Sequence, residues 1–269
     1  MILDRIARAK REEVAGLKKR VPQKDLLQAA ERAGAVRDFA AALRRGGMPA
    51  VIAEIKKGSP SAGIIRSRLD VAAIAASYER AGAAAISVIT DKRFFFGSLD
   101  YLTQARAATS LPLLCKDFII DAVQVLASRA AGADAILLIA ALLDSNTLPA
   151  LMDLAHSLGM ACLVEVHDEK ELAWVLKTEA RIIGINNRNL QTFAVDLHTT
   201  KRLMPMISGE RLVVSESGIQ DHHDLASLAA MGVQAALVGT SLMRAEEPGD
   251  RLRELLGASR RAAPRTQIG

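Results

Sequence analysis

The chain has 269 residues, half of which are hydrophobic, and its formal net charge is +5. This length allows one large α/β domain with a sizeable core, and the mild positive charge favours an anionic ligand. Basic residues gather near the two ends, at 5–20 and 251–265, but acidic residues interrupt both runs and no aromatic-studded basic strand accompanies them, which argues against nucleic-acid binding.

The first part of the chain is predicted to be helical. Apolar residues recur at helical spacing over residues 2–17, with charged residues between them. Further helices are expected near 25–33 and 38–45, and the glycine pair at 46–47 closes the last of them. We expect residues 1–47 to form an extension that packs on the main domain and does not fold separately.

The first predicted strand, residues 50–56, ends in two charges on one face. Strand side chains alternate with a period of two, so Glu54 and Lys56 point to the same side before Gly58 and Pro60 break the strand. Burying such a pair is costly unless the charges are paired or used. A charged strand end that leads into a Gly/Ser/Pro loop is typical of the catalytic end of an α/β sheet or barrel. The alternative is an ion pair at a surface edge.

After this strand one unit recurs, in which a helix ends in glycine and a short apolar strand follows at once. Glycine at a helix C-terminus supplies a left-handed cap. The instances are Gly82 before 85–89, Gly132 before 135–139, Gly159 before 162–164 and Gly232 before 235–238. Further strands are expected at 50–56, 112–116, 182–186 and 212–216. The pattern predicts a (β/α)8 TIM barrel over 48–258, with a doubly wound sheet as the alternative, and a flexible tail at 259–269.

Polar and charged residues stand at the carboxyl ends of several predicted strands. They are Glu54, Lys56, Lys116, Glu165, Asn186 and Glu216. In a barrel these strand ends meet at one mouth, where catalytic residues are found. One such residue fits a solvated loop charge, but the whole set in one register favours an active site.

Two glycine-containing loops predict a phosphate site. Ser217 and Gly218 follow the seventh strand, and Gly239 and Thr240 follow the eighth as the start of a short helix. Barrels often bind phosphate with these two loops, whose free N–H groups attract the anion. The alternative is ordinary helix capping by Ser217 and Thr240.

The segment after the second barrel strand, residues 91–101, holds Phe94, Phe95 and Phe96 in a chain with few aromatic residues. We expect a loop that closes an apolar wall, which an aromatic substrate would need. Plain packing of the loop is the alternative.

Several of these stretches, taken together, resemble the indole-3-glycerol-phosphate synthase family of tryptophan biosynthesis. They are residues 54–61, 115–119, 132–139, 184–190 and 215–219, with 97–98, 101–102 and 238–244 in support. The resemblance covers nearly the whole chain, including the helical extension that this family carries before its barrel.

The resemblance implies a lyase that uses no cofactor and no metal. A carboxyphenylamino-deoxyribulose phosphate would close its ring and lose CO2 and water, giving indole-3-glycerol phosphate. Lys116 suits the acid that ring closure needs at the ketone oxygen, and Lys56 or Arg188 suits the substrate carboxylate. Glu165 as acid, with Glu54 as its partner, would remove the hydroxyl.

The resemblance also implies how the substrate is held. Asn186 and Glu216 would orient the sugar hydroxyls and the lysines. The phosphate would be held by Ser59, Ser217, Gly218, Gly239 and Thr240. Phe118 and Leu138 would line the aromatic pocket.

The remaining sequence features concern where the protein acts. Cys115 and Cys162 have no disulfide or metal-ligand spacing, and the N-terminal residues lack an apolar signal core. We therefore expect a cytoplasmic protein. As a separate expectation, it acts as a monomer on a small molecule and binds neither nucleic acid nor membrane. The rivals are another phosphate-binding barrel enzyme, such as a sugar-phosphate isomerase or an aldolase, and a basic scaffold or RNA-binding protein.

Overall fold

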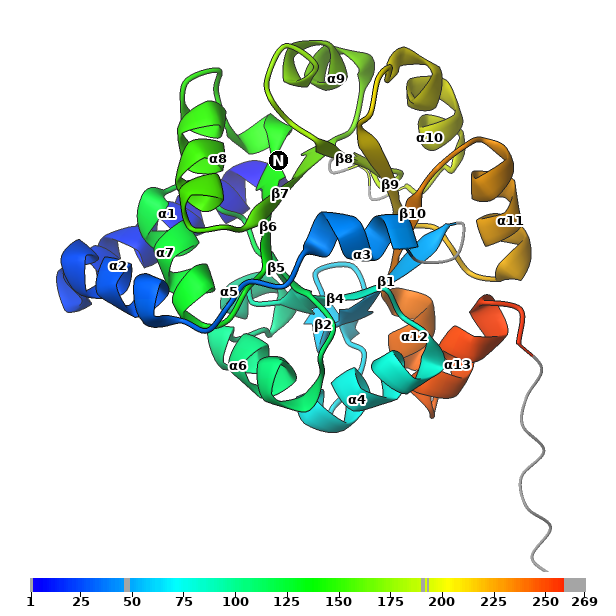
Figure 1. Cartoon of the computed structure of the whole chain (residues 1–269), viewed down its shortest axis with the longest axis horizontal. Coiled ribbons are helices and arrows are strands. Elements are labelled where there is room, and N and C mark those ends of the chain that lie inside the picture. Colours follow the sequence, from blue (N-terminus) through cyan, green and yellow to red (C-terminus); the bar gives the residue numbers. More distant parts are fainter. Residues whose placement is uncertain (1, 46–48, 190–191, 193, 259–269) are drawn as a thin grey trace, which may run out of the picture.

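The computed structural model describes residues 2–45, 49–189, 192 and 194–258. Eight parallel strands close into a barrel in the order β1-β10-β9-β8-β7-β6-β5-β4, and pairing of β1 with β4 completes the ring (Figure 1). The barrel strands are β1 (Ala50–Ile55), β4 (Ala85–Ile89), β5 (Leu113–Lys116), β6 (Ala135–Ile139), β7 (Ala161–Val166), β8 (Ile182–Asn186), β9 (Leu212–Glu216) and β10 (Ala235–Val238). This confirms the predicted (β/α)8 barrel, and the doubly wound sheet is excluded because the ring is closed.

Helices surround the barrel and connect its strands (Figure 1). They are α4 (Val71–Ala81), α5 (Lys92–Phe95), α6 (Leu99–Ala108), α7 (Ala122–Ala130), α8 (Thr147–Ser157), α9 (Glu169–Val175), α10 (His198–Leu203), α11 (His222–Ala230), α12 (Thr240–Arg244) and α13 (Pro248–Leu255), with the 3-10 helices η1 (Ala140–Leu142) and η2 (Met204–Met206). Gly82 and Gly132 adopt φ values of 96° and 98° after α4 and α7. The predicted glycine caps are therefore present, because this left-handed conformation costs glycine little.

Strand alternation divides the apolar residues between two cores. One core lies inside the barrel and includes Ile52, Leu114 and Leu163. The other lies between strands and helices and includes Cys115 and Val164. Because the side-chain period is two, every second residue of a strand faces the barrel axis, and the last of these face its mouth.

Three helices precede the barrel and wrap around it: α1 (Ile2–Arg20), α2 (Gln23–Arg32) and α3 (Phe39–Arg45). Helix α3 lies across one end of the barrel (Figure 1). Its Phe39 and Leu43 belong to the core inside the barrel together with Ala50 and Ala85, the first residues of β1 and β4. Helix α2 packs against α7, and the start of α1 lies at the opposite end, beside the carboxyl ends of the strands. The extension thus reaches both ends of the barrel. The glycine pair at 46–47, the predicted boundary at 47 and the predicted tail at 259–269 lie outside the described residues.

The structure differs from the sequence expectation in two connecting segments. The loop expected after Glu54 and Lys56 contains a short antiparallel hairpin, β2 (Gly58–Ser59) with β3 (Gly63–Ile64). The segment expected to be a loop at 91–101 begins with the short helix α5, because the Asp91 carboxylate caps it by accepting hydrogen bonds from the first free N–H groups of the helix.

Crossing a membrane would take a longer and more apolar helix than any that the described residues form.

Candidate active site

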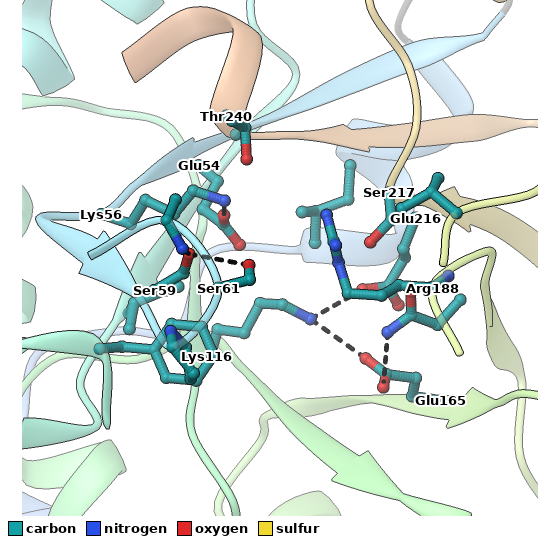
Figure 2. Close-up of a pocket in the computed structure, with 18 of the residues that line it drawn as sticks. Glu54, Lys56, Ser59, Ser61, Lys116, Glu165, Arg188, Glu216, Ser217 and Thr240 are labelled. Atoms are coloured by element: carbon teal, nitrogen blue, oxygen red, sulfur yellow. Dashed lines mark hydrogen bonds and ion pairs between the residues drawn. The ribbon is translucent and has the colours of Figure 1, made fainter. Parts of the chain in front are cut away.

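The carboxyl ends of the barrel strands surround a cavity of about 560 Å³. Side chains from β1, β5, β7, β8 and β9 converge on it (Figure 2). All the polar residues that the sequence placed at strand ends line this cavity: Glu54, Lys56, Lys116, Glu165, Asn186 and Glu216. Ionisable groups gathered in one pocket mark the functional end of a barrel.

Glu54 and Lys56 form an ion pair at the end of β1. Glu54 Oε1 lies 2.8 Å from Lys56 Nζ, and only 4% of the Glu54 side chain is exposed, so the pair is not a surface edge contact. A Cβ at Gly239 would overlap Glu54 Oε1 and would lie 3.0 Å from Lys56 Nζ. Gly239, after β10, therefore makes room for this pair in addition to its predicted place beside the phosphate.

Lys116 stands between two carboxylates. Its Nζ lies 2.7 Å from Glu216 Oε2 and 3.2 Å from Glu165 Oε2 (Figure 2). Burial alone would lower the pKa of Lys116, but Glu216 and Glu165 outweigh burial and raise it above its usual range. The side chain is therefore an ammonium that can donate a proton.

Glu165 has three polar partners. Besides Lys116, its Oε1 accepts a hydrogen bond of 3.0 Å from Asn186 Nδ2 and lies 3.1 Å from His167 Nε2. Burial would raise the pKa of Glu165, but Lys116 and His167 lower it well below its usual range. Glu165 is thus a carboxylate, and Glu54, its predicted partner, pairs with Lys56 instead.

Glu216 has fewer polar partners than Glu165, the other carboxylate beside Lys116. Its Oε1 is buried and has no hydrogen-bond partner among the described residues. Burial raises the pKa of Glu216 above its usual value, against the opposing effect of Lys116. A Cβ at Gly184 of β8 would overlap Glu216 Oε1, so this glycine provides the space that the carboxyl group occupies.

Apolar side chains also line the cavity, and we call them its apolar wall. Phe95 and Phe118 contact each other with ring centroids 5.9 Å apart. Leu137 and Ile139 of β6 and Ile2, Leu3 and Ile6 of α1 line the cavity as well. Of the three adjacent phenylalanines, only Phe95 is among the residues that line the cavity.

The prediction that Leu138 lines the aromatic pocket is wrong. Leu138 belongs to the core between the barrel and the helices, whereas Leu137 and Ile139 line the cavity. The physical reason is the two-residue alternation of β6, which turns Leu138 away from the barrel axis.

The predicted phosphate-binding residues lie along the same cavity. They are Ser59, Ser217, Gly218, Gly239 and Thr240, and Arg188 lies with them. Ser217 and Gly218 have φ values of 67° and 89°, so the chain makes a left-handed turn directly after β9. A Cβ at Gly218 would crowd Val195 and Leu197, which explains the glycine by close packing of the segment after β8.

Among the described residues, one cluster of side chains could offer ligands to a metal ion. Asp221, His223 and Asp224 bring potential ligand atoms within 4.8 Å of one another, on the exposed start of α11. Asp221 and Asp224 form the capping box of that helix, which accounts for their proximity.

Sequence reasoning missed His167 and the first turns of α1. His167 stands two residues after Glu165, and the alternation that linked Glu54 to Lys56 places it on the same face. The α1 residues carried no local signal, because only the path of the extension around the barrel brings them to the mouth.

Comparison with known proteins gives a consistent result. The family model described as indole-3-glycerol phosphate synthase matches residues 3–255. An indole-3-glycerol phosphate synthase from Polaromonas naphthalenivorans is 54% identical over 95% of this chain and 98% of that protein. Another from Burkholderia vietnamiensis is 51% identical over 92% of this chain and 96% of that protein.

Solved structures resemble the fold at much lower identity. A mutant tryptophan synthase α-subunit from Pyrococcus furiosus superposes with a TM-score of 0.60 at 14% identity, covering 78% of this chain and 98% of that one. A 3-hexulose-6-phosphate synthase from Salmonella typhimurium gives a TM-score of 0.62 at 11% identity, covering 77% of this chain and 96% of that one. At these identities the likeness concerns the barrel fold alone.

Proposed function

The chain belongs to the indole-3-glycerol phosphate synthase family, and we propose that the cavity at its barrel mouth is where its residues divide the work of that reaction. The enzyme is a carboxy-lyase of tryptophan biosynthesis. It converts 1-(2-carboxyphenylamino)-1-deoxy-D-ribulose 5-phosphate into indole-3-glycerol phosphate, CO2 and water. One observation chiefly supports this division of roles: Lys116 lies between Glu165 and Glu216 in the cavity.

Ring closure requires a proton at the ketone oxygen. The ring carbon that bears the carboxylate attacks the ketone carbon, and the oxygen takes a proton as the new bond forms. Lys116 suits this donor because its neighbouring carboxylates keep it an ammonium and hold it in place. Glu216 positions Lys116, and its unpartnered Oε1 can accept a substrate hydroxyl.

Decarboxylation follows ring closure and restores the aromatic ring. The bond to the carboxyl carbon breaks, its electron pair stays with the ring, and CO2 leaves. A cation must hold the carboxylate until then, and Lys56 and Arg188 both line the cavity. Arg188 suits this role because its planar guanidinium can make a bidentate contact with a carboxylate, and Lys56, which pairs with Glu54, is the alternative.

Dehydration needs an acid for the departing hydroxyl and a base for the proton on the neighbouring carbon. The sequence suggested Glu165 as the acid. Its lowered pKa favours the opposite assignment, because a carboxylate at the start of the reaction can take the proton. We therefore assign Glu165 as the base. The proton for the hydroxyl comes from Lys56, or from Lys116 after solvent has returned the proton it gave up at ring closure.

The two ends of the substrate match the two sides of the cavity. The anthranilate ring would lie against Phe95, Phe118 and the first turn of α1. The phosphate would lie at the other side, held by Ser59, Ser217, Gly218, Gly239 and Thr240, with N–H groups at the start of α12.

The decisive experiment is turnover of the carboxyphenylamino ketose phosphate by the purified protein, followed by indole fluorescence without added metal or nucleotide. Lys116→Ala should lower kcat by about 10²–10⁴-fold, the usual contribution of a general acid. Glu165→Gln should release CO2 but accumulate the closed, still hydroxylated product. Near wild-type turnover in both variants, with intact folds, would refute these roles.

The aldolase rival makes a different prediction. A Schiff-base aldolase would be trapped on Lys56 or Lys116 by borohydride in the presence of substrate, and mass spectrometry would detect the adduct. We expect no adduct, because ring closure at the ketone needs an ammonium donor and no imine.

We also propose that the enzyme acts as a cytoplasmic monomer. Cys115 and Cys162 are buried free thiols, which fits a reducing compartment. Light scattering of the purified chain and fractionation of the source cells would test the two statements separately.

A further inference from the structure

Two further ion pairs extend from the Glu165 oxygen that Lys116 does not contact. His167 follows the end of β7 and places its Nε2 3.1 Å from Glu165 Oε1. Its Nδ1 lies 3.0 Å from Glu171 Oε2, on α9. The imidazole therefore bridges a carboxylate of the active site and a carboxylate of a surrounding helix.

Glu171 is itself fixed in place. Its Oε2 also accepts a hydrogen bond of 2.8 Å from the His167 backbone N–H. The Glu171 backbone N–H donates to Asp168, which caps α9, at 2.9 Å. The turn from β7 into α9 thus presents one carboxylate oxygen to both the backbone and the ring of His167, which sets the ring orientation.

Both ring nitrogens lie next to a carboxylate oxygen. Nδ1 is hydrogen-bonded to Glu171, whereas Nε2 makes an ion-pair contact with Glu165 that lacks hydrogen-bond alignment. A carboxylate on each side favours the charged imidazolium. Only 12% of the His167 side chain is exposed, so water replaces neither contact easily. Burial would lower the pKa of His167, but the contacts with Glu165 and Glu171 raise it to about 10. At neutral pH the ring is therefore charged.

The charges around Glu165 come from several strands. Lys116 of β5 and His167 are the cations next to Glu165, and Asn186 of β8 donates a neutral hydrogen bond to it. Glu216 of β9 and Glu54 of β1 are acids whose charges raise the pKa of Lys116. Lys116 is shared with Glu216, whereas His167 contacts Glu165 alone among the acids that line the cavity.

We propose that His167, oriented by Glu171, is a positioning residue that keeps Glu165 ionised and directed at Lys116. The proposal rests on the proposed role of Glu165 as the base. His167 itself is not among the residues that line the cavity, so it acts on the reaction only through Glu165. A protonated Glu165 could not take the proton at the dehydration step. Without His167, Oε1 of Glu165 would keep only Asn186 as a partner among the described residues, which would weaken its orientation toward Lys116.

A purely structural role, in which His167 ties β7 to α9, is the alternative that the experiment must separate. His167→Gln keeps a donor near Glu165 but removes the charge. Without the imidazolium, Glu165 becomes easier to protonate, so the acid limb of the kcat profile should move to higher pH by about 1–3 units, the effect of an adjacent opposite charge. KM should change little.

Glu171→Gln provides a second variant that leaves His167 in place. It should move the acid limb in the same direction by a smaller amount, because the ring then loses its charge more easily. The matched control is His198→Gln, since His198 makes a similar contact of 2.9 Å with Asp196 but is 80% exposed on α10. Its profile should superimpose on that of the wild type.

The outcomes separate this inference from the proposed function. Loss of kcat in His167→Gln with an unmoved acid limb, or an unchanged profile in both variants, would overturn the positioning role. Failure of the proposed function would instead appear as absence of turnover by the wild-type enzyme at every pH. If His167→Gln does not fold, the Glu171→Gln profile alone decides.

Discussion

The ammonium of Lys10, on the first helix, lies 2.7 Å from the carboxylate of Asp117, the residue that follows Lys116. The same ammonium lies 2.8 Å from Asp91. Asp91 caps the helix that carries Phe95, and Asp117 precedes Phe118. Lys10 therefore ties α1 to both segments that supply the aromatic wall of the cavity.

Lys10→Met should destabilise the protein by about 3–5 kcal/mol, the usual cost of leaving buried charges without their partner. Burial alone would lower the pKa of Lys10, but Asp117 and Asp91 raise it, so the wild-type side chain is charged. The variant should also raise KM, because the wall that holds the aromatic ring loses its anchor. Urea unfolding and steady-state kinetics would measure the two effects.

Lys18→Met is the matched control on the same helix. Lys18 lies 2.6 Å from Asp121, but 49% of its side chain is exposed. Its loss should cost less than about 1 kcal/mol, because exposed pairs are screened by water. Equal losses of stability in the two variants would mean that Lys10 does not anchor the helix.

Gly184→Ala tests whether the space beside Glu216 matters for catalysis. The added Cβ would overlap Glu216 Oε1 and force the carboxyl group away from Lys116. We expect kcat to fall by about 10²-fold, as displacements of roughly 1 Å at a reacting centre can cause. Gly34→Ala is the control, since a Cβ there meets no atom within 4 Å. An unchanged kcat in Gly184→Ala would show that the position of Glu216 is not critical.

Asp134→Asn tests the opposite end of the barrel. The buried Asp134 carboxylate lies 2.7 Å from Arg106 and accepts hydrogen bonds from the backbone N–H groups of Arg37 and Leu113. Removing its charge should lower stability by about 3–5 kcal/mol, because Arg106 loses its buried partner. At a temperature where the variant is folded, kcat should match that of the wild type, since this end of a barrel serves stability. A large loss of kcat would contradict this division.

Much of this architecture follows from local patterns in the sequence. A glycine at the end of a helix, followed by a short apolar strand, recurs often enough to predict the barrel. The alternation of side chains along each strand then places Glu54, Lys56 and Lys116 at the mouth. The positions of these side chains can be predicted from the sequence because strand direction and side-chain alternation depend on local patterns alone.

What the sequence could not supply depends on contacts between distant segments. Ile2 and Ile6 line the cavity only because the extension reaches from one end of the barrel to the other. The partners of Glu165 likewise depend on which strand ends come within hydrogen-bond distance, about 3 Å, of one another. The wrong prediction for Leu138 has a different cause. The two-residue alternation that was applied to the other strands would have excluded this residue from the cavity.

His167 also makes stability depend on pH. Its pKa is about 10 in the folded protein, against an ordinary value near 6.5 for the unfolded chain. The folded state therefore binds this proton more tightly than the unfolded state does. The resulting stabilisation is fully present below about pH 6.5 and is lost as the pH rises through about 10.

His167→Gln should consequently cost most stability at low pH and progressively less across this window. Urea unfolding at about pH 6, 8 and 10 would show the difference in unfolding free energy between wild type and variant shrinking with pH. His198→Gln, at an 80% exposed side chain, should leave the wild-type dependence unchanged. If the difference for His167→Gln were the same at all three pH values, the ring would not be charged in the folded protein. Glu165 would then owe its ionisation to Lys116 and Asn186 alone.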